Sequence, residues 1–296
     1  ALKNLTDAKG VVNSMANDTL GSNVMREGER FSDSETRKLI DQFYTEGYCE
    51  LGSVLESDEV EALKSGLVRQ YSDPAMAADE EGDYIRGKSV MRLFETDNAH
   101  RDLIVREPLA SLAEEILGTD CHMMAQCGLV TEPLGVQGTK TGGGDWHCDD
   151  IVIFPLPDDI GRHDPRIRMP CYFFQIFIPL TDVESIEKGP TQIVPTSHYS
   201  GRQPPREESP HFEGRGPKSF LARAGDAYAF TGQIWHRGAP NTSDQTRYMT
   251  GVTYSSRFVS QRFYPFIDYR MPPHVMEGAG ERLQRMLGRH QKGPYG

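Results

Sequence analysis

Residues 142–150 read Gly-Gly-Gly-Asp-Trp-His-Cys-Asp-Asp, and two of them are well suited to bind a metal ion. His147 and Asp149 are two positions apart, and side chains two apart on an extended segment point to the same side. Imidazole nitrogens and carboxylate oxygens both ligate first-row transition metals. The segment therefore predicts two ligands for one ion, with Cys148 and Asp150 facing the other way.

A third ligand has to come from another part of the chain, which holds nine histidines. His236 follows the apolar segment 227–230 and precedes polar turn residues, as a residue between two strands would. His198 lies in a loop rich in Pro, Ser and Gly. We favour His236, with His198 as the alternative. Two histidines and one carboxylate form the facial ligand set of non-haem Fe(II) oxygenases, which leaves positions open for a cosubstrate and O₂.

An iron centre of this kind needs a second source of electrons. If that source is a 2-oxo acid, its far carboxylate requires a buried cation, and a guanidinium can bind a carboxylate through two parallel hydrogen bonds. Arg247 stands eleven residues after His236, at the start of the next β-branched and aromatic stretch. Arg247 is the candidate for this role, and an ordinary ion pair with an acid such as Asp244 is the alternative.

The elements that must position these residues change in character along the chain. Helices are predicted at 31–46, where Ser32 to Ser34 offer caps and Gly47 ends the helix, and at 57–71, with Ser57 as cap. Further helices are predicted at 108–118 and near 281–291. Short segments rich in β-branched and aromatic residues predict strands at 48–55, 121–130, 151–156, 169–180, 191–197, 226–232 and 247–258.

Helices followed by many short strands indicate a mainly β sandwich or barrel with a helical N-terminal layer. Residues 1–30 lack sustained periodicity and are predicted to be a loosely ordered segment, which leaves 31–296 as a single domain with flanking helices. No linker divides that domain.

Composition excludes several function classes. The formal net charge of -11 argues against nonspecific binding to nucleic acid or to an anionic membrane. The longest apolar run, residues 171–180, falls short of the roughly 18 residues that span a bilayer, and the N-terminus shows no apolar signal segment. Five cysteines without a CxxC motif indicate neither a disulfide framework nor a structural zinc site, and a reducing cytoplasm is the expected location.

The ordered motifs resemble the phytanoyl-CoA dioxygenase family of Fe(II)/2-oxoglutarate-dependent oxygenases. They are the His-x-Asp pair, GPTQIVPTSH (189–198), AGDAYAFTGQIWH (224–236) and the following arginine, and residues 31–67 resemble the family's helix–strand–helix opening. The similarity runs from about residue 31 to about residue 254. It implies a double-stranded β-helix, a jelly-roll barrel related to the cupins, and it implies Fe(II), 2-oxoglutarate and O₂ as cofactor and cosubstrates.

The resemblance also implies roles for individual residues. Those implied as metal ligands and catalytic residues are His147, Asp149 and His236; those implied to contact 2-oxoglutarate are Arg247, Thr191 and Gln126. The chain departs from some relatives at Gly144, where they have Gln, and from others at Gly238, where they have a hydroxyl residue. The remaining 2-oxoglutarate contacts are therefore not assigned.

The expected activity is hydroxylation of a small molecule at an unactivated C–H bond, with release of succinate and CO₂. The alternatives are a cupin-like metal-binding sensor and a related halogenase, which Asp149 disfavours because halogenases replace that carboxylate with a small residue. Substrate identity and the choice between monomer and homodimer stay open.

Arg86, Lys88 and Arg92 are interpreted as part of a solvated basic loop, with an anionic-substrate site as the alternative. Cys148 is interpreted as a small buried residue.

Overall fold

The computed structural model describes residues 25–26, 28–80, 82–136 and 143–290. Most of the predicted loosely ordered segment 1–30 lies outside these residues. The α-helices are α1 (Asp33–Glu46), α2 (Ser57–Tyr71), α3 (Pro74–Ala78), α4 (Asn98–Leu103), α5 (Leu109–Leu117), α6 (Pro273–Met276) and α7 (Glu281–Met286). Three single 3₁₀ turns are η1 (Leu93–Glu95), η2 (Ser197–Tyr199) and η3 (Phe266–Asp268).

Ten strands form two sheets in which every pairing is antiparallel. The large sheet has the order β1-β8-β5-β10-β4-β3-β2 and the small one β7-β6-β9. The strands are β1 (Tyr48–Ser53), β2 (Ile85–Arg86), β3 (Ser89–Met91), β4 (His122–Thr131), β5 (Phe173–Pro179), β6 (Thr191–Ile193), β7 (Lys218–Ser219), β8 (Asp226–Thr231), β9 (His236–Gly238) and β10 (Arg247–Ser255).

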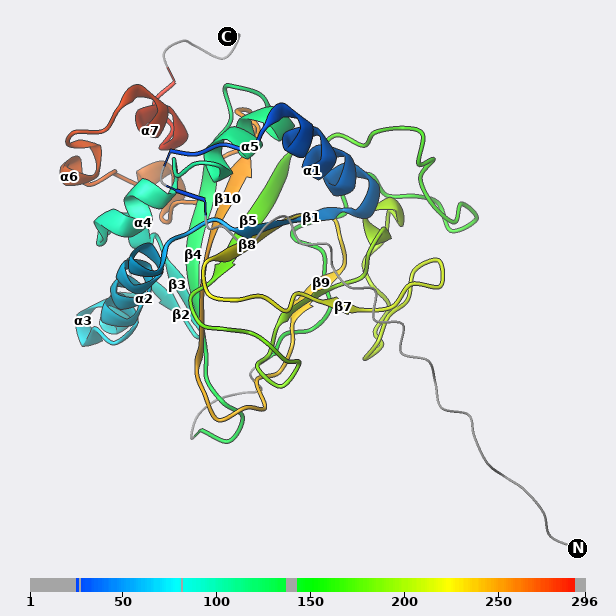
Figure 1. Ribbon diagram of the computed structural model, residues 1–296, viewed down its shortest axis with the longest axis horizontal. Helices are drawn as coiled ribbons and strands as arrows, with labels where there is room; N and C mark the ends of the chain where they lie inside the picture. The colour runs from blue at the N-terminus through cyan, green and yellow to red at the C-terminus, as the bar shows by residue number, and fades with distance from the viewer. Residues whose placement is uncertain (1–24, 27, 81, 137–142, 291–296) are drawn as a thin grey trace, which may run out of the picture.

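The two sheets face each other, and their inner side chains form one apolar cluster. Ile193 of the small sheet packs in that cluster with Phe177, Phe230 and Met249 of the large sheet. The helices cover the other face of the large sheet, and in Figure 1 α2, α3 and α4 flank β2, β3 and β4 on the side away from β7 and β9. This is the predicted arrangement, a jelly-roll barrel with a helical layer.

Successive side chains of β5 point alternately into the barrel and toward the helical layer. Phe174 and Ile176 belong to the large core under the helices, whereas Phe177 belongs to the inner cluster. Gln175 therefore faces inward, because successive side chains on a strand point to opposite faces. The register pairs Gln175 with Thr253 of β10, which faces the same cleft.

Local capping explains where the helices begin and end. Ser32 and Glu35 form a reciprocal capping box at the start of α1, and Gly47 ends the helix with a φ of 85°, which costs glycine little. The N-cap of α2 lies one residue before the predicted one. Ser57 is the first residue inside that helix, and Glu56 occupies the cap position in a box with Glu59.

The predicted strand at 151–156 is wrong. After Asp149 the chain turns at Asp150, whose φ is 57°, and continues as an irregular segment in which Ile151 is 76% exposed. The backbone N–H of Ile153 donates to the Gln233 side chain at 2.8 Å instead of to a sheet partner. The apolar run looked like a buried strand, but here the chain leaves the sheets to pack over a neighbouring loop.

The cysteines and the apolar content of the helices were also considered in the sequence, and the structure describes both. All five cysteines are free thiols. Burial raises the pKa of the Cys148 thiol to about 12, which fits a small packed residue better than a nucleophile. In the part of the chain that is described, no helix combines the length and apolar character needed to cross a bilayer.

The layer between sheet and helices should dominate the free energy of unfolding. Phe174 is fully buried there and packs edge-on against Phe43. We expect Phe174→Ala to lower the free energy of unfolding by about 3–5 kcal/mol, through lost burial and a cavity. Phe258→Ala, at a position 74% exposed, should change it by less than about 0.5 kcal/mol. Urea denaturation of both variants measures the difference, and equal losses would contradict this view of the core.

Candidate metal centre

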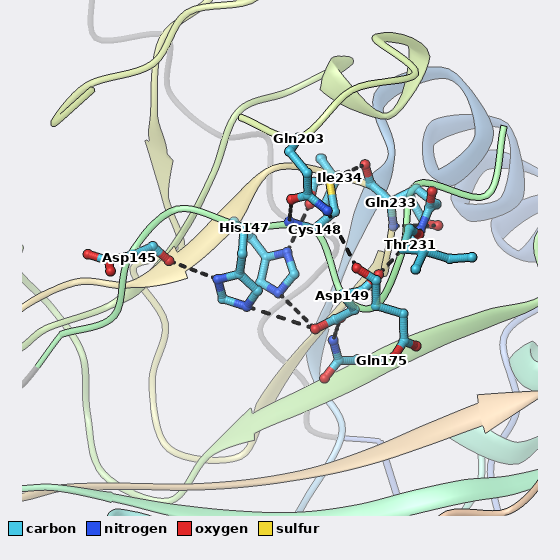
Figure 2. A network of polar contacts seen from close by, with 12 residues as sticks. Asp145, His147, Cys148, Asp149, Gln175, Gln203, Thr231, Gln233 and Ile234 are labelled. Atoms are coloured by element: carbon cyan, nitrogen blue, oxygen red, sulfur yellow. Dashed lines mark hydrogen bonds and ion pairs between the residues drawn. The ribbon is translucent and has the colours of Figure 1, made fainter. Parts of the chain in front are cut away.

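Backbone pairing brings the predicted ligands together. His147 and His236 form an isolated antiparallel bridge, with N–H to O distances of 3.0 Å and 2.9 Å in the two directions. The N–H of Asp149 donates to the Gly232 carbonyl at 2.8 Å. A segment that follows a glycine-rich loop is thereby fixed against the turn between β8 and β9. Figure 2 shows His147 and Asp149 side by side on that segment.

The three side chains converge on one point. Oδ1 of Asp149 lies 3.8 Å from Nε2 of His147 and 3.6 Å from Nε2 of His236, and one ligand atom from each residue lies within 4.8 Å of the other two. Ligands at right angles around an ion at about 2.1 Å are separated by roughly 3 Å. The separations in the triad are slightly wider than that, and only small side-chain movements are needed for the three residues to close on an ion.

The second nitrogen of each ring fixes its orientation. Nδ1 of His147 lies 2.8 Å from the Asp145 carbonyl, and Nδ1 of His236 lies 2.9 Å from the Ile234 carbonyl. A carbonyl oxygen can only accept, so each Nδ1 carries the proton and each Nε2 presents its lone pair to the centre. This is the arrangement that metal-ligating histidines usually show.

Electrostatics also prepare the site for a cation. Burial lowers the pKa of His147, and the neighbouring His236 lowers it further, so the ring stays neutral. Burial alone would raise the pKa of Asp149, but the hydrogen bond and charge of His236, with smaller contributions from His147 and Arg262, bring it below the usual value. These shifts favour the neutral imidazole of His147 and the ionised carboxylate of Asp149, the protonation states in which these groups ligate a metal.

Arg247 is buried inside the barrel with most of its donors unused. The side chain is 3% exposed, and Nη2 donates to Oγ1 of Thr131 at 2.9 Å. Nε and Nη1 have no hydrogen-bond partner, and no carboxylate of the described residues pairs with this guanidinium. The alternative of an ion pair with Asp244 is therefore not realised. A buried cation without a counter-ion is costly, which points to an anion as its missing partner.

Other polar groups gather around Arg247. A Cβ atom on Gly238 would lie 3.9 Å from both Nη2 of Arg247 and Nζ of Lys88, so the two cations approach the same space. Thr191 pairs with Gly238 across the small sheet and accepts a hydrogen bond of 2.9 Å from Tyr228. Burial, followed by the charge of Arg247, lowers the pKa of Lys88. Thr191 thus lies near Arg247, and its contact with 2-oxoglutarate stays a prediction; Lys88 and Tyr228 were missed.

Two other candidates lie away from the centre. Gln126 faces the helical layer, where its Oε1 accepts from the Phe94 N–H at 2.8 Å and its Nε2 donates to the His100 carbonyl at 2.6 Å. The structure does not bring its side chain to the site. His198 is half-buried in η2 with Nε2 3.1 Å from the Tyr44 carbonyl, and it is not part of the triad. Of the two histidines considered, the structure places His236 at the centre.

The basic segment of residues 86–92 is only in part the solvated loop that the sequence suggested, because Arg86 is exposed whereas Lys88 and Arg92 are not. Arg92 is 4% exposed and its Nε lies 2.9 Å from Oε1 of Glu95, while Lys88 is half-buried near Arg247. Together with Arg86, Arg92 lines a cleft of about 520 Å³ that reaches Asp149. No local pattern in the sequence distinguishes such residues from exposed ones, because the short β2–β3 hairpin is buried only through its contact with β4.

Gln175 is a further polar residue of this cleft that sequence reasoning missed. Its Nε2 donates to Oδ2 of Asp149, as Figure 2 shows. A signal was present: Gln175 interrupts the otherwise apolar stretch Phe-Phe-Gln-Ile-Phe-Ile of β5, and a buried polar side chain needs a partner.

Comparisons with known proteins agree with this geometry. A family model described as phytanoyl-CoA dioxygenase (PhyH) matches residues 43–249. Among solved structures, the non-heme alpha ketoglutarate dependent epimerase SnoN from nogalamycin biosynthesis is 19% identical, with a TM-score of 0.56 over 76% of this chain and 84% of that chain.

Two further structures are similar to the same degree. HygX from Streptomyces hygroscopicus, solved with nickel and 2-oxoglutarate bound, is 19% identical, with a TM-score of 0.54 over 76% of this chain and 88% of that chain. The carbocyclase SnoK from nogalamycin biosynthesis is 20% identical, with a TM-score of 0.55 over 79% of this chain and 88% of that chain. At these identities the likeness establishes the fold, a double-stranded β-helix.

The triad geometry predicts a divalent-metal site that each of its three residues is needed to form. We expect His147→Ala, Asp149→Ala and His236→Ala each to weaken Ni²⁺ binding strongly, measured by anaerobic calorimetry on metal-free protein. His211→Ala is the control, because that exposed ring bonds to the Ser209 carbonyl and takes no part in the triad. Ni²⁺ affinity unchanged in all three triad variants would rule the site out.

Proposed function

Because the chain belongs to the phytanoyl-CoA dioxygenase family, we propose that it is an Fe(II)- and 2-oxoglutarate-dependent oxygenase that hydroxylates a small molecule. The observation that carries the proposal is a buried guanidinium with two unpartnered nitrogens in the same barrel as a two-histidine, one-carboxylate triad. A metal-binding sensor has no need of a cation at that place.

The donor set fits iron(II). His147, Asp149 and His236 would hold the ion through Nε2, Oδ1 and Nε2, which is the facial ligand set of non-haem iron oxygenases. Iron(II) with 2-oxoglutarate and O₂ supplies an oxidant strong enough to attack an unactivated C–H bond, with succinate and CO₂ as by-products. The protein contributes ligation, orientation and a partly enclosed cleft.

Arg247 is suited to the distal carboxylate of 2-oxoglutarate. Its two terminal nitrogens can donate together to one carboxylate, because Nη1 has no partner and Nη2 carries a second hydrogen besides the one that it donates to Thr131. Lys88 adds a second positive charge near the same space, and Tyr228 and Thr191 add hydroxyl groups. Burial raises the pKa of Tyr228 to about 12, so its hydroxyl stays protonated. This polar group supports the choice of a dicarboxylic cosubstrate.

The cleft beside Asp149 supports a small-molecule substrate with little net negative charge. Its arginines are already compensated by acids: Arg86 pairs with Asp83, Arg92 with Glu95, and Arg262 with Asp150. Much of the remaining lining is apolar or aromatic, from Met91, Met124, Phe173, Tyr264 and Phe266. A cleft of about 520 Å³ has the size of a small-molecule site. An epimerase of this fold was solved in complex with Fe³⁺, alpha ketoglutarate and nogalamycin RO.

Replacement of Arg247 tests the cosubstrate directly. We expect Arg247→Leu to weaken 2-oxoglutarate binding roughly 10- to 100-fold, since a charge-assisted bidentate contact is lost. Titration of the visible charge-transfer band of the anaerobic Fe(II) protein measures the affinity. The Tm of the metal-free protein should stay level or rise, because an unpaired buried charge is removed. A band with unchanged affinity in this variant would contradict the proposed anchor.

A second pair of variants tests whether the position of Lys88, and not only its charge, contributes to 2-oxoglutarate affinity. Lys88→Met should weaken 2-oxoglutarate binding less than Arg247→Leu does, because Lys88 is only half-buried. Lys38→Met removes the same charge from an exposed position on α1 and should leave the affinity unchanged. Equal effects of the two lysine substitutions would mean that the net charge of the protein, and not the position of Lys88, sets the affinity.

Turnover under ¹⁸O₂ decides which reaction the iron centre performs. We expect substrates found by a succinate-release screen to gain one ¹⁸O atom, detected by mass spectrometry, as hydroxylation requires. Epimerisation or ring closure, reactions named for two structural neighbours, would give succinate without labelled product. Chloride-dependent product would indicate a halogenase, which the presence of Asp149 in the triad disfavours. Metal binding without any succinate release would favour a sensor.

A further inference from the structure

The Asp149 carboxylate accepts a hydrogen bond from the side chain of another residue, in addition to the backbone contacts of Asp149. Nε2 of Gln175 donates to Oδ2 of Asp149, while Oδ1 is the oxygen that faces both imidazoles. Gln175 comes from β5, on the far side of the cleft from the segment that carries the ligands, and the two side chains meet in Figure 2.

We propose that Gln175 is a positioning residue that holds the Asp149 carboxylate so that Oδ1 alone is presented to the metal. The inference rests on the metal site of the proposed function and goes beyond it, because it assigns each oxygen of Asp149 a separate task. An amide N–H on Oδ2 competes with the metal for that oxygen and favours binding through one oxygen. A coordination position that a two-oxygen carboxylate would occupy then stays open.

The sheet explains why Gln175 reaches this place reliably. It pairs with Thr253 of β10 and Phe230 of β8, in the interior of a seven-stranded sheet, so its backbone is fixed on both sides. In the described part of the chain, no other side-chain amide or hydroxyl donates to the Asp149 carboxylate. The Gln233 side chain lies close, but it donates to the backbone carbonyls of Asp149 and Ile151.

Ligating carboxylates are commonly oriented by hydrogen bonds from a second layer of residues, and loss of such a partner typically weakens metal binding by about 10- to 100-fold. A merely structural glutamine would behave differently. Its loss would lower the stability of the metal-free fold and leave the affinity of the remaining folded protein unchanged.

Gln175→Met removes the amide with little change in side-chain size. We expect the Ni²⁺ affinity of the metal-free protein, measured by anaerobic calorimetry, to fall about 10- to 100-fold, with little change in its Tm. Ni²⁺ is used because it is stable in air and binds imidazole well. The infrared carboxylate stretches of the Ni²⁺ protein should shift from a one-oxygen to a two-oxygen pattern.

Gln126→Met is the matched control. Gln126 lies on β4, two strands from Gln175 and on the opposite face of the same sheet, where it bonds to Phe94 and His100. Its replacement should lower the Tm, because a buried backbone N–H and carbonyl lose their partner, and should leave the Ni²⁺ affinity unchanged. We therefore expect Gln175→Met to lower the Ni²⁺ affinity but not the Tm, and Gln126→Met to lower the Tm but not the Ni²⁺ affinity.

A double-variant cycle tests the route through Asp149. In the Asp149→Ala background, where two imidazoles remain, Gln175→Met should change the weakened Ni²⁺ affinity less than about two-fold. A full loss in that background would show that Gln175 acts elsewhere and would overturn the inference. Wild-type protein that binds no Ni²⁺ would overturn the proposed function as well, whereas normal wild-type binding with an unaffected Gln175→Met variant would overturn the inference alone.

Discussion

The candidate site depends on a short stretch of backbone pairing outside the regular strands. The bridge between His147 and His236, and the bond from Asp149 to Gly232, hold the segment that carries His147 in register with the first residue of β9 and the turn before it. A change of one residue in that register would turn His147 or His236 away from the centre, because neighbouring side chains point to opposite sides. The remaining geometry, from the ring orientations to the convergence on Oδ1, follows from this pairing.

The large sheet then gives each of its faces a different task. The helix face carries the main core, from Phe43 to Tyr254, and holds Gln126 in a purely structural hydrogen-bond pattern. The inner face carries Gln175 and Arg247, whose polar atoms point toward the metal site and the interior of the barrel. The larger core therefore lies on the helix side of these strands, whereas the inner side combines a smaller apolar cluster with the polar residues of the site.

Much of this could be predicted from sequence, and the failures have physical causes. The His-x-Asp spacing and the strand context of His236 predicted three side chains that the structure brings together, because the alternation of side chains along an extended segment is a local property. Residues 151–156 looked like a strand because an apolar run carries no information about whether a partner strand is near. Lys88 and Gln175 were missed because their burial comes from pairing with β4, β8 and β10, which are distant in sequence.

Under the proposed anchor role of Arg247, binding of the cosubstrate would also stabilise the fold. An anion that binds there binds the folded chain and not the unfolded one, so it adds to folding stability by mass action, by about 2.7 kcal/mol at a concentration of 100 times its Kd. A chain that buries such a guanidinium would be least stable when that anion is scarce. Its steady-state abundance would then follow the supply of its own cosubstrate, even without a dedicated regulator.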